Sequence, residues 1–271
     1  MWLGILKQAF VAYFKGNNGF IAGTLAFSAL LAIFPFVIFL VSLTGLYSEA
    51  FGVQQGIQYI ISYLPTEVEK TFNSVITEIT STKSGGLLTF GFLGTLYMLV
   101  SAVDTLRMGL NQAYDVSECR PFLMRTLQNI GVVFFMAISL VTVSVLIILG
   151  PIILDYLYRY IDWMVGYTTL LNVARYACGL ALMVSLLAST YYVLPNIRQR
   201  WRCCLPGAIF ATCLWLSLAS LFSFYLQYAD SYSVTYGSLS GIIITMVFLK
   251  ISAMIFLLGA EFNQAYLRAK S

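Results

Sequence analysis

Two apolar stretches of this chain contain charged and amide side chains. The first, "SAVDTLRMGLNQAY", covers residues 101–114, and the second, "VFLKISAMIFLLGAEFNQAY", covers residues 247–266. The polar residues in them that could form a site are Asp104, Arg107, Asn111, Lys250, Glu261 and Asn263. Such a mixture of carboxylates, cations and amides suits two roles. It could line a cavity that handles a charged substrate or ion, or it could form an internal charge network that fixes helix register.

Enzymatic chemistry has few candidate residues. The chain contains no histidine, which excludes Ser–His and Cys–His catalysis and imidazole-ligated zinc or haem. Its five cysteines form no CxxC pair, and no glycine-rich phosphate loop is present. Glu67, Glu69 and Glu78 are best explained as the wet face of an amphipathic helix. We therefore expect no enzymatic activity, no metal site and no cofactor.

The composition indicates a membrane protein. The 271 residues are 60% hydrophobic and only 10% charged, whereas a soluble domain has about 25% charged residues. Six apolar stretches reach the roughly 20 residues that a spanning helix needs, near 20–46, 87–111, 127–154, 169–194, 206–229 and 237–262. The long unbroken runs exclude a β-barrel, whose strands alternate. We expect an all-α polytopic membrane protein with six transmembrane helices and a single integral membrane domain over residues 1–271.

Basic residues predict the orientation of the chain. One alternating set of connecting segments holds nine lysines and arginines, and the opposite set holds three. Because cytoplasmic loops are enriched in basic residues, both termini are expected in the cytoplasm. The basic run "NIRQRWR" at residues 196–202 is explained by this rule, so we expect no nucleic acid partner.

This orientation assigns a depth to the charged residues. Lys250 falls near the bilayer centre, where Asp104 is the nearest carboxylate in depth. Asp104 and Arg107 are three residues apart and can pair within one helix. Glu261 falls at the cytoplasmic end, within depth reach of Arg107. Eleven residues separate Lys250 from Glu261, a rise of about 16 Å, so these two side chains share a face but cannot touch.

Two further segments are predicted to be amphipathic. Residues 1–16 are expected to form an interfacial helix. Its apolar face holds Leu3, Leu6, Phe10 and Tyr13, and Lys7 and Lys15 are available for anionic headgroups. The outer loop at 48–85 is expected to form two short amphipathic helices joined at Pro65. These helices pack against the bundle, or they act as a lid or a membrane-surface element. Both interpretations remain open.

Small residues indicate close helix packing in the last apolar stretch. Gly237 and Gly241 lie four residues apart, a spacing that lets two helices approach closely. Gly237 is equally suited to end the turn that follows the outer loop.

The stretch "YGSLSGIIITMVFLKISAMIFLLGAEFNQAY" resembles the closing segment of the YihY/virulence factor BrkB family of bacterial inner-membrane proteins. The resemblance extends to "LAFSALLAIFPFVIFL" with Pro35, "LVSAVDTLRMGLNQAYDV", "YYVLPN" with Pro195 and Asn196, and "LPGAIFATCLWL". It therefore covers nearly the whole chain in order. It implies six transmembrane helices and a location in the bacterial inner membrane.

The resemblance also bears on function. Members of the family have carried a ribonuclease label, which this sequence does not support. The family's link to virulence and cell-envelope integrity favours envelope-related transport, including that of lipid. The family-like residues in the second half of the chain are Pro195, Asn196, Tyr236, Gly237, Gly259, Glu261 and Asn263. Lys250 departs from the family pattern, which expects an aromatic or apolar residue there.

Two functional hypotheses follow. The first is a transporter that moves lipid or another envelope-related substrate through a polar cavity bounded by the first, second and sixth transmembrane helices. The second is a non-transporting structural or assembly protein of the cell envelope that binds partners through its outer loop. Membrane lipids are expected partners in both cases, and a homo-oligomer or an envelope protein partner is compatible with either.

Overall fold

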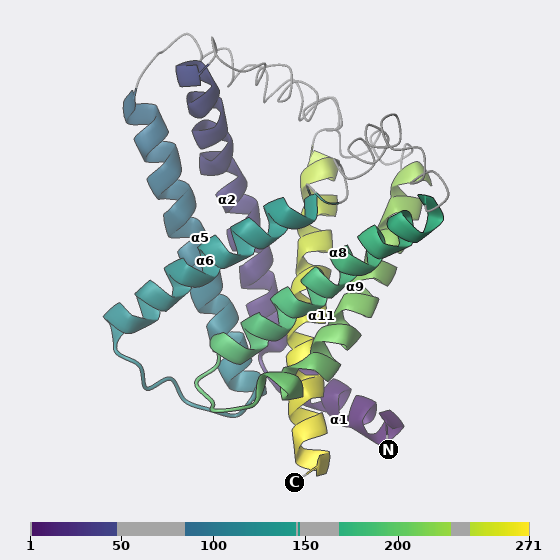
Figure 1. Cartoon of the computed structure of the whole chain (residues 1–271). Coiled ribbons are helices and arrows are strands. Elements are labelled where there is room, and N and C mark those ends of the chain that lie inside the picture. Colours follow the sequence, from purple (N-terminus) through teal and green to yellow (C-terminus); the bar gives the residue numbers. More distant parts are fainter. Residues whose placement is uncertain (1, 48–84, 145, 147–167, 229–238, 271) are drawn as a thin grey trace. The chain divides into compact units, whose positions relative to one another are not determined.

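The computed structural model describes residues 2–47, 85–144, 146, 168–228 and 239–270 (Figure 1). In these residues the structure has seven helices and no strands, which confirms the predicted all-α class. The helices are α1 (Trp2–Lys15), α2 (Asn18–Tyr47), α5 (Gly85–Ala113), α6 (Phe122–Ser144), α8 (Thr168–Val193), α9 (Trp201–Tyr228) and α11 (Leu239–Lys270). All of them except α1 are long and apolar enough to cross a membrane.

Each predicted span corresponds to one of these six helices, and three boundaries within the described residues differ from the prediction by five residues or more. Helix α9 starts at Trp201 instead of near 206. Helix α6 starts at Phe122 instead of near 127, because the carbonyl of Pro121 already accepts a hydrogen bond from the N–H of Arg125. Helix α11 continues eight residues beyond 262 to Lys270. Its extension is amphipathic, since Ala265 is buried while Lys270 is exposed.

Two groups of predictions lie outside the described residues. The amphipathic helices of the first outer loop, with their joint at Pro65, fall in residues 48–84. Gly237 falls in residues 229–238. These assignments stay predictions, as does the cytoplasmic placement of the two termini.

The chain forms two compact units that are not successive along the sequence. One contains Met1–Asn18, Arg107–Leu216 and Ile255–Ser271, and the other contains Gly19–Leu106 and Ser217–Met254. Helices α5, α9 and α11 each contribute residues to both units.

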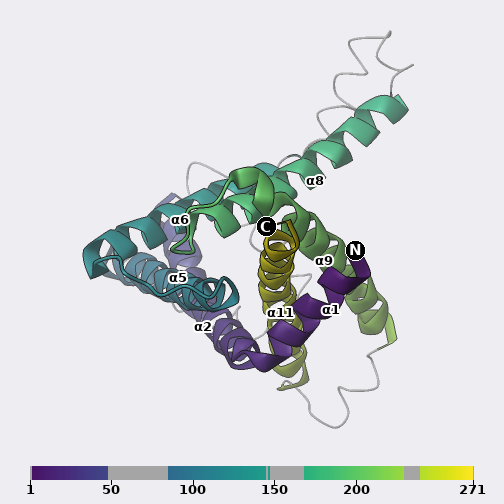
Figure 2. The same ribbon diagram turned by 90° about the horizontal axis from the view of Figure 1, so that it is seen from below.

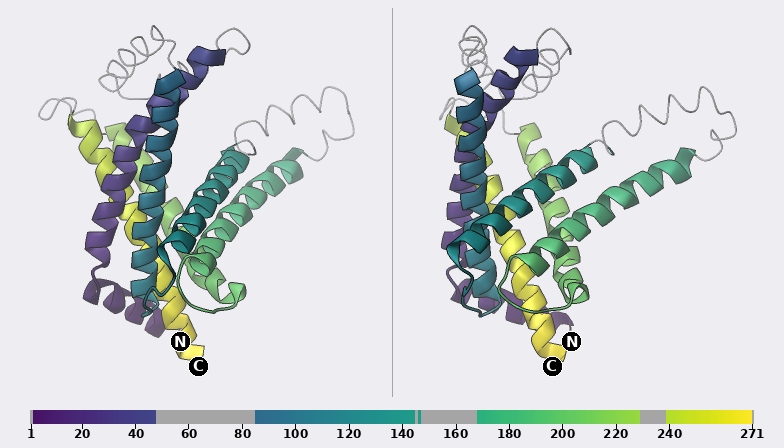
Figure 3. Two further views of the ribbon diagram at one scale, coloured as in Figure 1. Left: turned by 90° about the vertical axis from the view of Figure 1, so that its left-hand side faces the viewer. Right: turned by 60° about the vertical axis from the view of Figure 1, so that its left-hand side comes forward.

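In the unit that contains Gly19–Leu106, α2 and α5 run side by side (Figure 3). Their backbones approach closely at Gly91, where an added Cβ would lie 2.6 Å from the backbone nitrogen of Phe39. One turn along, a Cβ on Gly94 would lie 3.2 Å from the Cβ of Pro35. Pro35 lies within the continuous helix α2 and packs where α5 carries no side chain. Glycine on one helix thus makes room for the proline on the other.

In the unit that contains Arg107–Leu216, α6 packs against α8, and α1 packs against the C-terminal part of α11 (Figures 2 and 3). Ile5 and Ala9 of α1 are buried against Phe262 and Ala265 of α11. The packed face of α1 is therefore centred on Ile5, Ala9 and Tyr13, because these residues repeat every four positions. Phe10, which was predicted on the apolar face of an interfacial helix, lies outside this packed face and is 46% exposed.

Candidate functional site

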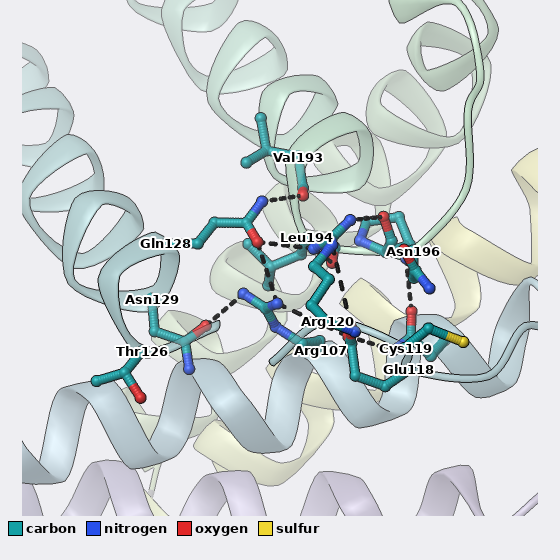
Figure 4. Close-up of polar contacts among 12 residues, drawn as sticks. Arg107, Glu118, Cys119, Arg120, Thr126, Gln128, Asn129, Val193, Leu194 and Asn196 are labelled. Atoms are coloured by element: carbon teal, nitrogen blue, oxygen red, sulfur yellow. Dashed lines mark hydrogen bonds and ion pairs between the residues drawn. The ribbon is translucent and has the colours of Figure 1, made fainter. Parts of the chain in front are cut away.

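Arg107 lies at the centre of a buried polar network near the C-terminal end of α5 (Figure 4). Its side chain is only 1% exposed. Nη1 donates to Oε1 of Gln128 at 3.1 Å, and Nη2 donates to Oδ1 of Asn129 at 2.6 Å. Both partners lie about two turns into α6. Nη1 also lies 3.7 Å from Oε2 of Glu118, so the buried guanidinium has a counter-charge.

The turn after α5 brings Glu118 to this network. Asp115 has a positive φ of 56°, the N–H of Val116 donates to the carbonyl of Asn111, and the N–H of Asp115 donates to the carbonyl of Gln112. These bonds form a Schellman motif, which ends α5 with Asp115 in the position that usually holds glycine. The side-chain amide of Asn111 then donates to Oε2 of Glu118 at 3.0 Å.

The electrostatics of Glu118 follow from its partners. Partial burial alone raises the pKa of its carboxyl group. The hydrogen bonds from Asn111 and from the backbone N–H of Arg120, together with the charges of Arg120 and Arg107, outweigh this effect. The pKa of Glu118 is therefore lowered, and the carboxylate stays ionised at neutral pH.

Arg120 and Gln128 bind the C-terminal end of α8 (Figure 4). Arg120 donates from Nη1 to the carbonyl of Leu194 at 3.1 Å and from Nη2 to the carbonyl of Pro195 at 2.9 Å. Gln128 donates to the carbonyl of Val193 at 2.7 Å. A helix leaves its last carbonyls without partners inside the helix, and a cation there also complements the helix dipole. The network thus joins the ends of α5 and α8 to the start of α6.

Asn111 and Asn196 complete this junction. The backbone N–H of Asn196 donates to Oδ1 of Asn111 at 2.8 Å, and the side-chain amide of Asn196 donates to the carbonyl of Ser117 at 2.9 Å. Pro195 and Asn196, which the family resemblance singled out, therefore lie in the network that contains Arg107. Since the polar groups described here bond to one another, the arrangement is suited to holding helix ends together rather than to binding a substrate.

Glu261 belongs to a separate polar cluster at the junction of α1 and α2. Oε1 of Glu261 accepts a hydrogen bond from the amide of Asn18 at 3.0 Å, and the same amide donates to the carbonyl of Tyr13 at 3.2 Å. Gln112 of α5 donates to Oδ1 of Asn18 at 3.3 Å. Glu261 is only 6% exposed, and Asn18 holds its carboxylate in place of the expected Arg107.

A cavity of about 650 Å³ opens beside Glu261. Helix α1, the end of α5 and the last turns of α11 line it. Its charged lining residues are Lys7, Lys15, Asp115, Glu261 and Arg268. The wall also includes Gln8, Gln112 and Gln264, with small side chains such as Ala12 and Ala265 between them. The lining therefore offers charges of both signs, amides and a partly apolar surface.

Asn263 of α11 bonds to the backbone of α9 where these two helices pack closely. Its Oδ1 accepts from the backbone N–H of Gly207 at 2.6 Å, and its Nδ2 donates to the carbonyl of Cys204 at 3.2 Å. A Cβ on Gly207 would collide with the carbonyl oxygen of Gly259, and a Cβ on Gly259 would lie 2.9 Å from the carbonyl oxygen of Gly207. The hydroxyl of Tyr191 donates to the carbonyl of Phe256 beside this contact. Asn263 thus acts within the helix packing.

The other predicted residues lie in the second unit. Asp104 is half-buried in α5. Lys250 of α11 is exposed and forms no hydrogen bond or ion pair within the part of the chain that the structure describes, so the expected pair with Asp104 is not formed. The carbonyl of Gly241 accepts a hydrogen bond from the hydroxyl of Thr245 at 2.7 Å. The six predicted polar residues are therefore divided: Asp104 and Lys250 belong to the unit that contains Gly19–Leu106, and the other four belong to the unit that contains Arg107–Leu216.

Sequence reasoning missed the neutral amides that organise both clusters. Asn18, Gln128 and Asn129 were not predicted to be part of a site, although two of them are fully or almost fully buried. The available signal was the adjacent pair Gln128–Asn129 inside an apolar segment, where a polar group needs a partner as an ion does. Among the described residues, no three His, Cys, Asp or Glu side chains come together as a metal site would require.

Comparison with known proteins identifies relatives over nearly the whole chain. The sequence model of the family described as virulence factor BrkB matches residues 9–271. A Bacillus subtilis protein named putative ribonuclease-like protein YfkH is 31% identical over 265 residues, which cover 96% of this chain and 94% of that protein. A UPF0761 membrane protein of Pseudoalteromonas translucida is 26% identical over 257 residues, which cover 89% of this chain and 78% of that protein. No solved structure matches the chain.

Proposed function

The chain belongs to the virulence factor BrkB family of membrane proteins, and on this premise we propose that it is a transporter that moves lipid or another envelope-related substrate. We place it in the bacterial inner membrane with both termini in the cytoplasm, as the distribution of its basic residues predicts. No enzymatic step and no cofactor are part of this proposal.

One observation carries the proposal. Glu261, a carboxylate on a helix long enough to cross a membrane, lines an open cavity of about 650 Å³ together with basic residues. A carboxylate buried on a membrane helix is costly, and in membrane proteins such groups commonly mark the path of a substrate or an ion. The volume lies within the range of about 300–1,000 Å³ that is typical of small-molecule sites.

The candidate residues are accordingly reassigned. Glu261 remains in the proposed cavity, which α1, α5 and α11 bound in place of α2, α5 and α11. Arg107 and Asn111 hold the ends of three helices, and Asn263 holds the contact between α9 and α11. The hydrogen bonds of Arg107 within the chain favour a structural role for that residue. This role supports the non-transporting alternative only as far as Arg107 is concerned.

A lipid redistribution assay tests the proposal. The full chain is reconstituted into vesicles that contain a small fraction of phosphatidylethanolamine with a fluorescent label, and dithionite is added to quench the label in the outer leaflet. Transport would expose the label of the inner leaflet, so quenching would proceed beyond the half expected for protein-free vesicles. Glu261→Gln keeps the shape of the side chain and is expected to slow redistribution at least about tenfold, which corresponds to about 1.4 kcal/mol.

Lys270→Gln is the matched control, because Lys270 is exposed on the same end of α11 and does not line the cavity. Its rate should equal that of the wild type. Quenching of half the label by the wild type, as in empty vesicles, would favour the structural or assembly role instead. Redistribution that Glu261→Gln leaves unchanged would assign Glu261 to a structural role.

A further inference from the structure

We propose that the cavity binds a headgroup that carries both a phosphate and a hydrogen-bond donor, with Lys7 and Lys15 on the phosphate and Glu261 on the donor. This inference rests on the proposed function, since it names the substrate class of the same cavity. Phosphatidylethanolamine and phosphatidylglycerol have this chemistry, and so do soluble esters such as phosphoethanolamine. Phosphatidylcholine has the phosphate but no donor.

The lysines of α1 supply the positive charge. Lys7 and Lys15 both line the cavity, are exposed, and form no ion pair within the described part of the chain. Eight residues separate them, a rise of about 12 Å along one helix. Arg268 differs from them, because its Nη2 lies 3.8 Å from Oδ2 of Asp115, which also lines the cavity. The two lysines are therefore the cations best placed to accept an anion, and a lysine ammonium bridges readily to a phosphate oxygen.

Glu261 supplies the negative charge, which requires a hydrogen-bond donor on the ligand. Oε1 accepts the hydrogen bond from Asn18, whereas Oε2 accepts none from the residues that the structure describes. An ionised carboxylate can accept about four hydrogen bonds, and a mostly buried one with unused capacity favours a donor. A ligand with only negative charge would be repelled by this carboxylate. A phosphate joined to an ammonium or hydroxyl group matches the lysines and the carboxylate together.

The surface of α1 suits a lipid as the source of this headgroup. Phe14 is 72% exposed and Phe10 is also exposed, although α1 buries another face in the protein. Exposed aromatic residues beside lysines on one helix are typical of segments that lie in the membrane interface. The acyl part of a lipid would then remain in the bilayer while its headgroup enters the cavity.

Equilibrium binding to the full chain in detergent tests the inference. Phosphatidylethanolamine, phosphatidylglycerol and phosphatidylcholine are titrated separately, and binding is followed by native mass spectrometry. The first two lipids should bind at least about tenfold more tightly than phosphatidylcholine. Competition by phosphoethanolamine identifies the source. Displacement of the lipid at similar concentrations would indicate that a soluble ester is sufficient, and no displacement would indicate a lipid ligand.

The variants assign the residues. The double variant Lys7→Gln/Lys15→Gln should weaken binding about 30-fold. Each lysine near an anionic membrane surface contributes about 1 kcal/mol, or roughly fivefold in affinity, and the two factors multiply. Both lysines are exposed, so this double variant should retain the fold. Glu261→Gln should reduce the preference for phosphatidylethanolamine over phosphatidylcholine, and Lys270→Gln should bind as the wild type does. Equal affinity for all three lipids, or a double lysine variant with unchanged affinity, would overturn the inference.

Binding and transport can fail separately. If phosphatidylethanolamine binds with the expected preference but is not redistributed in vesicles, the headgroup site stands and the transport function fails. If redistribution occurs and is insensitive to Lys7 and Lys15, transport stands and this assignment of its substrate site fails.

Discussion

Replacing Arg107 with methionine is expected to destabilise the protein by about 3 kcal/mol, at the lower end of the 3–5 kcal/mol that removing one partner of a buried ion pair costs. The side chain donates two hydrogen bonds, to Gln128 and Asn129, and each bond from a charged donor contributes about 1.5–3 kcal/mol. Methionine avoids the desolvation of a buried guanidinium, which offsets part of this loss. Glu118 keeps Asn111 and Arg120 as partners, so it is not left without compensation.

The assay is unfolding in dodecyl maltoside micelles with increasing sodium dodecyl sulfate, followed by far-ultraviolet circular dichroism. Arg198→Met is the matched control, because Arg198 is exposed and forms no hydrogen bond or ion pair with other described residues. The control should change the free energy of unfolding by no more than about 0.5 kcal/mol. A loss below about 1 kcal/mol for Arg107→Met, or a loss equal to that of the control, would show that the network does not stabilise the fold as its geometry indicates.

Three further predictions concern the same unit. Because the folded-state pKa of Glu118 is lowered, its contribution to stability should be complete above the ordinary value of 4.5 and disappear as the pH falls through the lower folded value. Glu118→Gln should remove this pH dependence in the same unfolding assay. Gly207→Ala should destabilise the protein by about 1–3 kcal/mol, because its Cβ would collide with the backbone of Gly259. Asp115→Gly should stabilise the protein by up to about 1 kcal/mol in thermal unfolding. Relief of a positive φ, which costs a non-glycine residue about 1–2 kcal/mol, outweighs the roughly 0.4–1 kcal/mol lost through the greater freedom of glycine in the unfolded chain.

Each of these has an outcome that contradicts it. If the difference in unfolding free energy between the wild type and Glu118→Gln stays constant between pH 6 and 3, Glu118 does not contribute to the pH dependence of stability. Near-normal stability of Gly207→Ala would mean that α9 and α11 can separate at little cost. For Asp115→Gly, a lower unfolding temperature than that of the wild type would show that the ion pair with Arg268 outweighs the backbone strain.

The membrane helices were predictable from sequence because local composition decides whether a segment can enter lipid. Inside lipid, the polar backbone groups must then bond within the segment. Runs of about 20 apolar residues must form helices in a bilayer, whatever their neighbours are. The boundaries were less predictable. Helix α11 reaches Lys270 in an amphipathic extension whose inner face, at Phe262 and Ala265, packs against α1.

The candidate site was predictable only in part. Glu261 could be singled out because a single ionisable residue in an apolar run is visible in the sequence, and the structure shows that it is buried. Its partner was not, because Asn18 is 243 residues away and is brought to Glu261 by the packing of α1 on α11. The same holds for Lys250. Depth alone suggested Asp104 as its partner, whereas Lys250 is exposed and forms no ion pair with the residues that the structure describes.

The sequence by itself determined that this chain is an all-α membrane protein with six spanning helices, and it identified the family through motifs spread along the chain. Only the tertiary structure decided which polar residues meet. Hydropathy is a property of each segment, whereas a hydrogen bond such as that of Arg107 to Asn129 depends on the rotation and crossing of two helices. The structure therefore assigned Arg107, Asn111 and Asn263 to helix junctions, and it placed Glu261 with Lys7 and Lys15 around one cavity.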